Sequence, residues 1–349
     1  MSEEAPVIEE AVASEETPIV RGVRRWVLGA RPRTLPAAVV PVVVGTAVGW
    51  YYATVASRSP AVYGSIGISW THPLTDLSAL SWWRFALALI VSLAIEIGTN
   101  YANDYSDGVR GTDEARAGPL RLVASKSATP RAVKTAAIIS FGLAGVAGIG
   151  LSAVTTWWLI PVGLLCVAAG WLYTGGPKPY GYAGLGELFV FVFFGLVATG
   201  GSAYVQSPRA FAFGIATGRE FVPGYFAALV VVWASIAVGM LATSLLQANN
   251  LRDVSTDAIH EKKTLAVRVG RKAAGRIYVG SLLVTAVAVL LVAFVRPWAL
   301  LAFVAAPLAI KPSKLALSNA GGRDLLPLLA ATGRLQLLAG TLLAVGVIL

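Results

Sequence analysis

Residues 82–113 read WWRFALALIVSLAIEIGTNYANDYSDGVRGTD. From residue 85 to residue 103 this stretch is apolar apart from Glu96, and it closes on three aspartates, Asp104, Asp107 and Asp113. A carboxylate at the centre of a membrane helix costs about 2.5 to 3.5 kcal/mol on insertion scales. Such a cost is tolerated where the carboxylate faces water, a cation or a substrate. The stretch therefore predicts a membrane-spanning helix with a functional acidic end.

The whole chain has the composition of an integral membrane protein. Of its 349 residues, 56% are hydrophobic and 13% are charged, whereas a soluble domain carries about 25% charged residues. The single cysteine, Cys166, excludes an internal disulfide. Residues 1–20 contain six glutamates and no basic residue, which predicts a disordered acidic tail rather than a signal peptide. Residues 21–349 are expected to form one membrane-embedded domain.

Long charge-free runs indicate where the chain crosses the membrane. A span needs about 20 apolar residues. Two further helices are expected after Arg296. The prediction is an all-α polytopic bundle of about nine transmembrane helices. In addition to 85–103, the qualifying runs are 34–57, 135–156 with 157–177, 188–208, 221–251 and 277–295.

The distribution of lysine and arginine predicts the orientation of the bundle. If the N-terminus is cytoplasmic, 23 of the 28 basic residues fall on the cytoplasmic side. This places the C-terminus outside a plasma membrane. The net charge of +10 then lies mainly at the cytoplasmic face, against anionic lipid, and is not interpreted as binding to nucleic acid.

A second acidic patch, NNLRDVSTD at residues 249–257, ends the sixth predicted span. Four helices separate it from the first patch, so both patches are expected on the cytoplasmic side. At 100° per residue, the oxygen-bearing side chains of each helix share one face. They are Glu96, Asn100, Asn103 and Asp107 on the first helix, and Asn249, Asp253 and Asp257 on the second.

Two facing carboxylate stripes repel each other unless a cation lies between them. Oxygen ligands favour a hard ion such as Mg²⁺, which binds through a few carboxylates together with substrate phosphates. Basic side chains at the same face would complete a diphosphate site. These are Arg116, Arg121, Lys178, Lys262, Lys263 and Arg268.

Other interpretations of these residues stay open. Each acidic patch alone could be a solvated helix end, and Glu96 could bond a neighbouring helix. Intramembrane carboxylates also line the ion paths of cation-coupled transporters. The basic residues beside both patches argue against a transporter, because a cation path does not need them.

The motifs resemble those of the UbiA superfamily of intramembrane prenyltransferases. Asn103, Asp104 and Asp107 match its NDxxD motif, and Asp253 and Asp257 resemble its DxxxD motif. The passages ARPRTLPAAVVPVVVG, NDYSDGVRGTDEARAGPLR, NNLRD…TD and KKTLAVRVG further resemble the menaquinone-pathway branch, the 1,4-dihydroxy-2-naphthoate polyprenyltransferases.

One acidic position departs from the broad superfamily. The third acid often falls where this chain has Gly111, and Asp113 comes two residues later. The menaquinone branch would account for this shift, because its motif has the form GTD, as at residues 111–113 here. The shift nonetheless puts a direct ligand role for Asp113 in question.

The resemblance implies a bundle around a central cavity that cytoplasmic loops cap. Mg²⁺ and the loops would hold a polyprenyl diphosphate, and 1,4-dihydroxy-2-naphthoate would accept the prenyl group with loss of CO₂ and diphosphate, giving demethylmenaquinol. Other branches of the superfamily use 4-hydroxybenzoate, haem or chlorophyllide as the acceptor and remain alternatives. Donor chain length and oligomeric state stay open.

The resemblance also implies roles for individual residues. The implied metal ligands are Asn103, Asp104, Asp107, Asp113, Asp253 and Asp257. The implied catalytic residues are Asp107, Asp253, Asp257 and Lys178. The implied substrate-binding residues are Asn103, Arg121, Asn249, Asn250, Arg252 and Lys262.

Overall fold

The computed structural model describes residues 19–56, 80–112, 120–208 and 223–349. The acidic tail predicted over residues 1–20 lies outside the described residues except for its last two positions. Asp113 and Arg116 also lie outside them.

The secondary structure of the described residues is helical throughout, as the sequence predicts. In chain order the elements are α1 (Val23–Gly29), α2 (Pro36–Ala56), α3 (Trp82–Arg110), α4 (Pro130–Val154), α5 (Leu159–Leu172), η3 (Tyr180–Ala183), α6 (Gly186–Val190), η4 (Phe191–Thr199), α7 (Gly200–Gln206), α9 (Pro223–Ile259), α10 (Leu265–Val269), α11 (Arg271–Val295), η5 (Pro297–Ala305), α12 (Pro307–Leu317), η6 (Gly322–Leu325) and α13 (Leu326–Ile348).

The number of membrane spans depends on how the short helix α5 and the bent pair of η5 and α12 are counted. Within the described residues, seven helices are long and apolar enough to cross a membrane, and the pair η5 and α12, which meet at 52°, adds an eighth. The apolar helix α5 has only 14 residues. The all-α, multi-pass fold is confirmed, and the predicted number of nine is reached only if α5 and the bent pair each count as one span.

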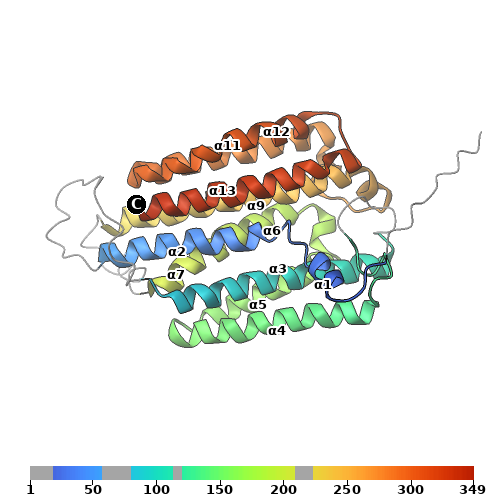
Figure 1. The fold of residues 1–349 in the computed structure, drawn as a ribbon, viewed down its shortest axis with the longest axis horizontal. Helices are drawn as coiled ribbons and strands as arrows, with labels where there is room; N and C mark the ends of the chain where they lie inside the picture. The colour runs from blue at the N-terminus through green and yellow to red at the C-terminus, as the bar shows by residue number, and fades with distance from the viewer. Residues whose placement is uncertain (1–18, 57–79, 113–119, 209–222) are drawn as a thin grey trace, which may run out of the picture.

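The long helices lie side by side with their axes roughly parallel (Figure 1). Helices α3, α4 and α5 pack together on one side, α11 and α12 lie on the other, and α2, α9 and α13 lie between. The chain ends at the end of the bundle opposite to α1 (Figure 1). In the following, the two ends of the bundle are called the α1 end and the C-terminal end.

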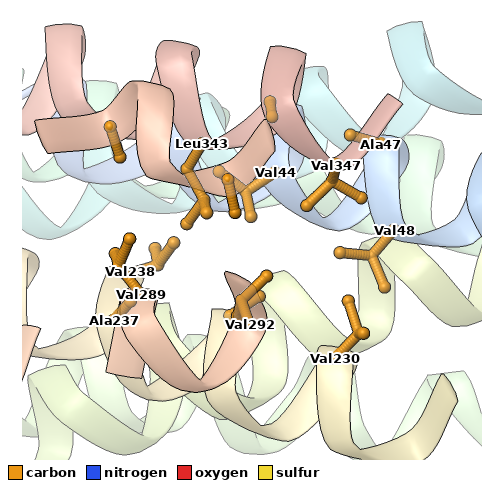
Figure 2. Close-up of a cluster of buried hydrophobic side chains, with 14 of the residues drawn as sticks. Val44, Ala47, Val48, Val230, Ala237, Val238, Val289, Val292, Leu343 and Val347 are labelled. Carbon is orange, nitrogen blue, oxygen red and sulfur yellow. The ribbon is translucent and has the colours of Figure 1, made fainter. Parts of the chain in front are cut away.

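The core near the C-terminal end consists of small and branched apolar side chains. Figure 2 shows Val48 of α2 and Leu343 of α13 facing Val292 of α11 across this core. Glycine lets α2 approach α7 closely, because a Cβ on Gly49 would lie 2.6 Å from the carbonyl oxygen of Ala203. Lipid tails are as apolar as these side chains, so close packing rather than water exclusion holds such helices together.

Candidate active site

An apolar cavity of about 720 Å³ opens between the helices. Its walls include Ile149 of α4 and Leu164 of α5, which are 53% and 66% exposed. Because both residues lie within their helices, the cavity reaches the accessible surface along the side of the bundle. Aromatic rings line it nearer the loops, where Tyr180 stacks on Phe189 with ring centroids 3.9 Å apart.

The polar stripe predicted on α3 lies in the cavity wall. Glu96, Asn100, Asn103 and Asp107 all line the cavity, so the helical spacing assigns their shared face correctly. Asn103 is held from the loop after α5, because its Oδ1 accepts a hydrogen bond of 2.8 Å from the Thr174 hydroxyl.

The acidic ends of α3 and α9 meet at one lysine. Lys262 Nζ lies 4.0 Å from Asp107 Oδ2 and 3.8 Å from Asp257 Oδ1, and all three side chains are buried. The sequence predicts that facing carboxylates need a cation between them. Among the described residues, the Lys262 ammonium group is that cation.

The end of α9 places Lys262 at this point. Glu261 has a left-handed backbone with φ of 54°, and the Lys262 N–H donates to the Asp257 carbonyl oxygen at 2.9 Å. This is the hydrogen bond of a Schellman helix end, in which glycine is usual at the left-handed position. A lysine there is also favoured by the negative end of the helix dipole.

Asp253, the first residue of the second motif, faces an arginine. Arg252 donates from Nε and Nη2 to the two carboxylate oxygens, each at 2.7 Å, and both side chains are buried. The remaining Arg252 nitrogen, Nη1, has no hydrogen-bond partner among the described residues. Arg252 also lines the cavity, so it joins the second acidic patch to the cavity wall.

Asp104 points away from the cavity and holds a loop. Its Oδ2 accepts from the Leu122 N–H at 2.8 Å and its Oδ1 from the Val123 N–H at 3.0 Å. The side chain is fully buried and is not part of the cavity wall. These contacts fix the segment that carries Arg121, a buried residue that does line the cavity.

The remaining predicted residues are divided between the cavity and the surface. Asn249 and Asn250 line the cavity, and Asn250 Nδ2 donates to Glu187 Oε1 at 2.9 Å. Lys178 is exposed and lies outside the cavity wall. Lys263 and Arg268 are exposed as well.

Tyr182 is a site residue that the sequence analysis missed. Its hydroxyl donates to Asp107 Oδ1 at 2.8 Å, and Lys262 Nζ lies 5.2 Å from the centre of its ring. Burial and the charge of Asp107 raise the pKa of Tyr182 to about 12, so the phenol stays protonated as a donor. Tyr182 lies four residues after Lys178, in the segment YTGGPKPYGY at residues 173–182, and its tyrosines are the signal in the sequence.

The described residues offer a divalent cation two converging carboxylates. Among them, no three histidine, cysteine or acidic side chains gather closely enough to hold a metal by themselves. Asp107 and Asp257 nonetheless direct oxygens at the same cation position. Mg²⁺ commonly takes one or two protein carboxylates and completes its shell with water and substrate phosphates. The donor set fits such a shared site.

The comparisons with known proteins agree with this architecture. The model of the UbiA prenyltransferase family matches residues 66–320. The chain is 46% identical, over 88% of its length and 91% of the relative's, to 1,4-dihydroxy-2-naphthoate octaprenyltransferase of Mycobacterium tuberculosis. It is 32% identical, over 93% and 95%, to the Escherichia coli K12 protein of the same name.

A solved structure shows the same fold at low sequence identity. A UbiA homologue from Archaeoglobus fulgidus, bound to GPP and Mg²⁺, aligns with a TM-score of 0.50 and 14% identity over 91% of this chain and 99% of that one. Because the family model matches most of the chain and a relative is 46% identical to it, the chain belongs to the UbiA prenyltransferase family.

Proposed function

We propose that the protein transfers a polyprenyl group from its diphosphate to 1,4-dihydroxy-2-naphthoate, releasing diphosphate and CO₂ and forming demethylmenaquinol. The observation that carries the proposal is the 46% identity, across 88% of the chain, to a relative named for this naphthoate activity. The cavity supports it, because acidic and basic groups lie at one end of a space that is otherwise apolar.

The donor diphosphate belongs at the meeting point of α3 and α9. Asp107 and Asp257 would hold Mg²⁺, with Asp253 beside them, and the bound ion would neutralise charge on the departing diphosphate. The family member solved with GPP and Mg²⁺ supports this assignment. Lys262, Arg252 and Arg121 are the buried cations that would contact phosphate oxygens.

Asp104 and Lys178 receive different roles from those that the motif implies. Asp104 is proposed as a positioning residue, because both of its oxygens accept backbone N–H groups. Lys178 is exposed, so we expect it to attract the donor rather than to take part in bond breaking. Its loop still contributes directly through Tyr182.

The apolar cavity suits the allylic cation that forms when the diphosphate leaves. Its lateral opening gives the long prenyl chain a path from the lipid, and its walls exclude water from the reactive carbon. The faces of Tyr180 and Phe189 would stabilise positive charge by cation–π interaction. A soluble pocket would have to bury the same chain completely.

Decarboxylation removes the need for a strong base at the attacked carbon. The ring carbon that bears the carboxylate attacks the allylic carbon and forms the new C–C bond. The bond to the carboxylate then breaks, CO₂ leaves, and its electron pair restores the aromatic ring. No ring proton has to be taken from that carbon.

The proposed topology places the α1 end, with the charged site, in the cytoplasm. The distribution of basic residues supports this orientation. A reporter fused after Leu349 should then be external, and one inserted near Gly111 should be cytoplasmic. A cytoplasmic Leu349 reporter would contradict the orientation, which predicts opposite sides for the two positions.

Carboxyl-labelled naphthoate tests the proposed reaction directly. Purified protein in nanodiscs is given a long polyprenyl diphosphate, Mg²⁺ and the labelled acceptor, and the label should leave as CO₂ in step with product formation. Retention of the label in the prenylated product would contradict the mechanism. Turnover of 4-hydroxybenzoate but not of the naphthoate would assign the protein to another branch of the family.

A further inference from the structure

The segment between α1 and α2 carries an arginine in a strained backbone conformation. Arg31 has φ of 56°, a left-handed value that is unfavourable for a residue with a side chain. Backbone hydrogen bonds hold it there, from the Arg31 N–H to the Leu28 carbonyl at 3.1 Å and from the Thr34 N–H to the Arg31 carbonyl at 2.9 Å. Strain of this kind persists only where surrounding contacts determine it, and it concentrates at functional sites.

A polar network on α3 pins this segment to the cavity wall. Asn100 Nδ2 donates to the Ala30 carbonyl oxygen at 3.1 Å, and the Thr34 hydroxyl donates to Glu96 Oε1 at 3.0 Å. Asn100 and Glu96 are therefore occupied in holding the residues on either side of Arg31. Glu96 and Asn100 therefore have a role separate from diphosphate binding, which is to fix the segment that carries Arg31.

The Arg31 guanidinium group lies in the cavity wall with unused donors. Arg31 lines the cavity, and its Nε and Nη2 are buried from solvent without a hydrogen-bond partner among the described residues. A buried charged donor without a partner is costly. Two buried guanidinium donors without a partner, on a strained backbone beside a cavity, therefore indicate a site for an anion.

We infer that Arg31 binds the carboxylate of the aromatic acceptor and so orients the ring for attack; this rests on the proposed function. The planar guanidinium fork matches a carboxylate in bidentate geometry. The segment is anchored at Asn100, about 10 Å along α3 from Asp107, so Arg31 enters the cavity from a level deeper than the meeting point of the acidic helix ends. Lys262, Arg252 and Arg121 are already assigned to the diphosphate at the meeting point of α3 and α9.

Arg31→Gly is the sharpest variant, because glycine adopts the left-handed backbone without strain. The variant removes the guanidinium group and leaves the segment free to keep its conformation. Arg31→Gln keeps a side chain at the strained position, and Arg24→Gln, on the exposed face of α1, is the matched control for loss of one positive charge. Thermal unfolding of each purified variant establishes that it is folded.

Binding without turnover separates the two anions. Naphthoate binding to the purified protein is measured by tryptophan fluorescence, beside 1,4-dihydroxynaphthalene, which lacks the carboxylate, and a non-hydrolysable prenyl thiolodiphosphate with Mg²⁺. Arg31→Gly and Arg31→Gln should weaken naphthoate binding by about 10- to 100-fold, the range for a lost charge-assisted hydrogen bond. Both should leave 1,4-dihydroxynaphthalene and the thiolodiphosphate within about threefold of wild type, and Arg24→Gln should change none of the three.

Three results would overturn the inference. They are unchanged naphthoate binding, equal weakening of naphthoate and 1,4-dihydroxynaphthalene, and selective weakening of the thiolodiphosphate, which would make Arg31 part of the diphosphate site. If the wild-type protein binds 4-hydroxybenzoate but not the naphthoate, the proposed function is wrong, and the inference about Arg31 is still open to test. The same variants, compared on 4-hydroxybenzoate and phenol, then decide the role of Arg31.

Discussion

At the α1 end of the bundle, the buried side chains include Lys262, whose Nζ lies within 4.0 Å of a carboxylate oxygen of both Asp107 and Asp257. At the C-terminal end, the buried cluster consists of residues such as Val48 and Val292. The first arrangement keeps charges out of water and needs every partner in place. The second tolerates exchange of one apolar residue for another of similar volume. The α1 end is therefore organised for chemistry and the C-terminal end for stability.

Backbone strain follows the same division. The described residues other than glycine with positive φ are Arg31, Lys126 and Glu261, and all three lie in connections at the α1 end. Strained residues and buried charges both reduce stability, and proteins retain them where function needs them. Variants at the two ends should thus separate activity from stability.

The largest expected effect is the loss of turnover in Asp107→Asn. The amide keeps the shape of the side chain but removes a negative charge from the cation position shared with Asp257. We expect turnover to fall by about 10³-fold, at the upper end for loss of one electrostatic group in an active site. Mn²⁺ binding measured by electron paramagnetic resonance should weaken in parallel. Unchanged Mn²⁺ binding would show that Asp107 is not a ligand.

A core variant should give the opposite pattern. Leu343→Ala removes a side chain that is 1% exposed, and we expect a loss of about 2–5 kcal/mol in the free energy of unfolding from the cavity it leaves. Turnover per folded molecule should stay near wild type. A large fall in that value would mean that the two ends are coupled.

Asp104→Asn tests the division inside the acidic motif itself. An asparagine accepts with one oxygen only, so one of the N–H groups of Leu122 and Val123 loses its partner. We expect a stability loss of about 1–3 kcal/mol, with Mn²⁺ affinity changed far less than in Asp107→Asn. Equal loss of Mn²⁺ affinity in both variants would make Asp104 a ligand and refute its positioning role.

The smallest expected effect is a gain in stability. Glu261→Gly relieves the left-handed strain at the end of α9, and we expect an increase of up to about 1 kcal/mol in the free energy of unfolding. Glu261→Ala keeps the strain and serves as the control, with no comparable gain. If alanine stabilises as much as glycine, the charge of Glu261 rather than its backbone is the cause.

The sequence predicted the helices well because apolar periodicity and length determine them directly. It also placed Glu96, Asn100, Asn103 and Asp107 on one face, because the turn of a helix fixes that relation. It did not predict which partner each side chain meets. Asp104 and Asp107 belong to one motif, yet one binds backbone N–H groups and the other faces Lys262, because loop closure decides these contacts.

The same reason explains why some residues of the site have no signal in the sequence. Lys178 and Tyr182 share one loop, and only the folded loop shows that the tyrosine reaches Asp107 while the lysine remains exposed. Arg31 is not among the site residues that the sequence predicts. Its left-handed backbone has no signature in residue type, since glycine or asparagine is expected at such a position.

The opening of the cavity along the side of the bundle, at α4 and α5, affects how the enzyme has to be measured. A donor and a product that enter and leave through this opening are dissolved in the bilayer, so their effective concentration is a number per unit area of membrane. Adding lipid or detergent at a constant amount of donor dilutes it at the enzyme. An apparent KM in molar units should therefore rise with the lipid or detergent content, whereas one expressed as a mole fraction should stay constant.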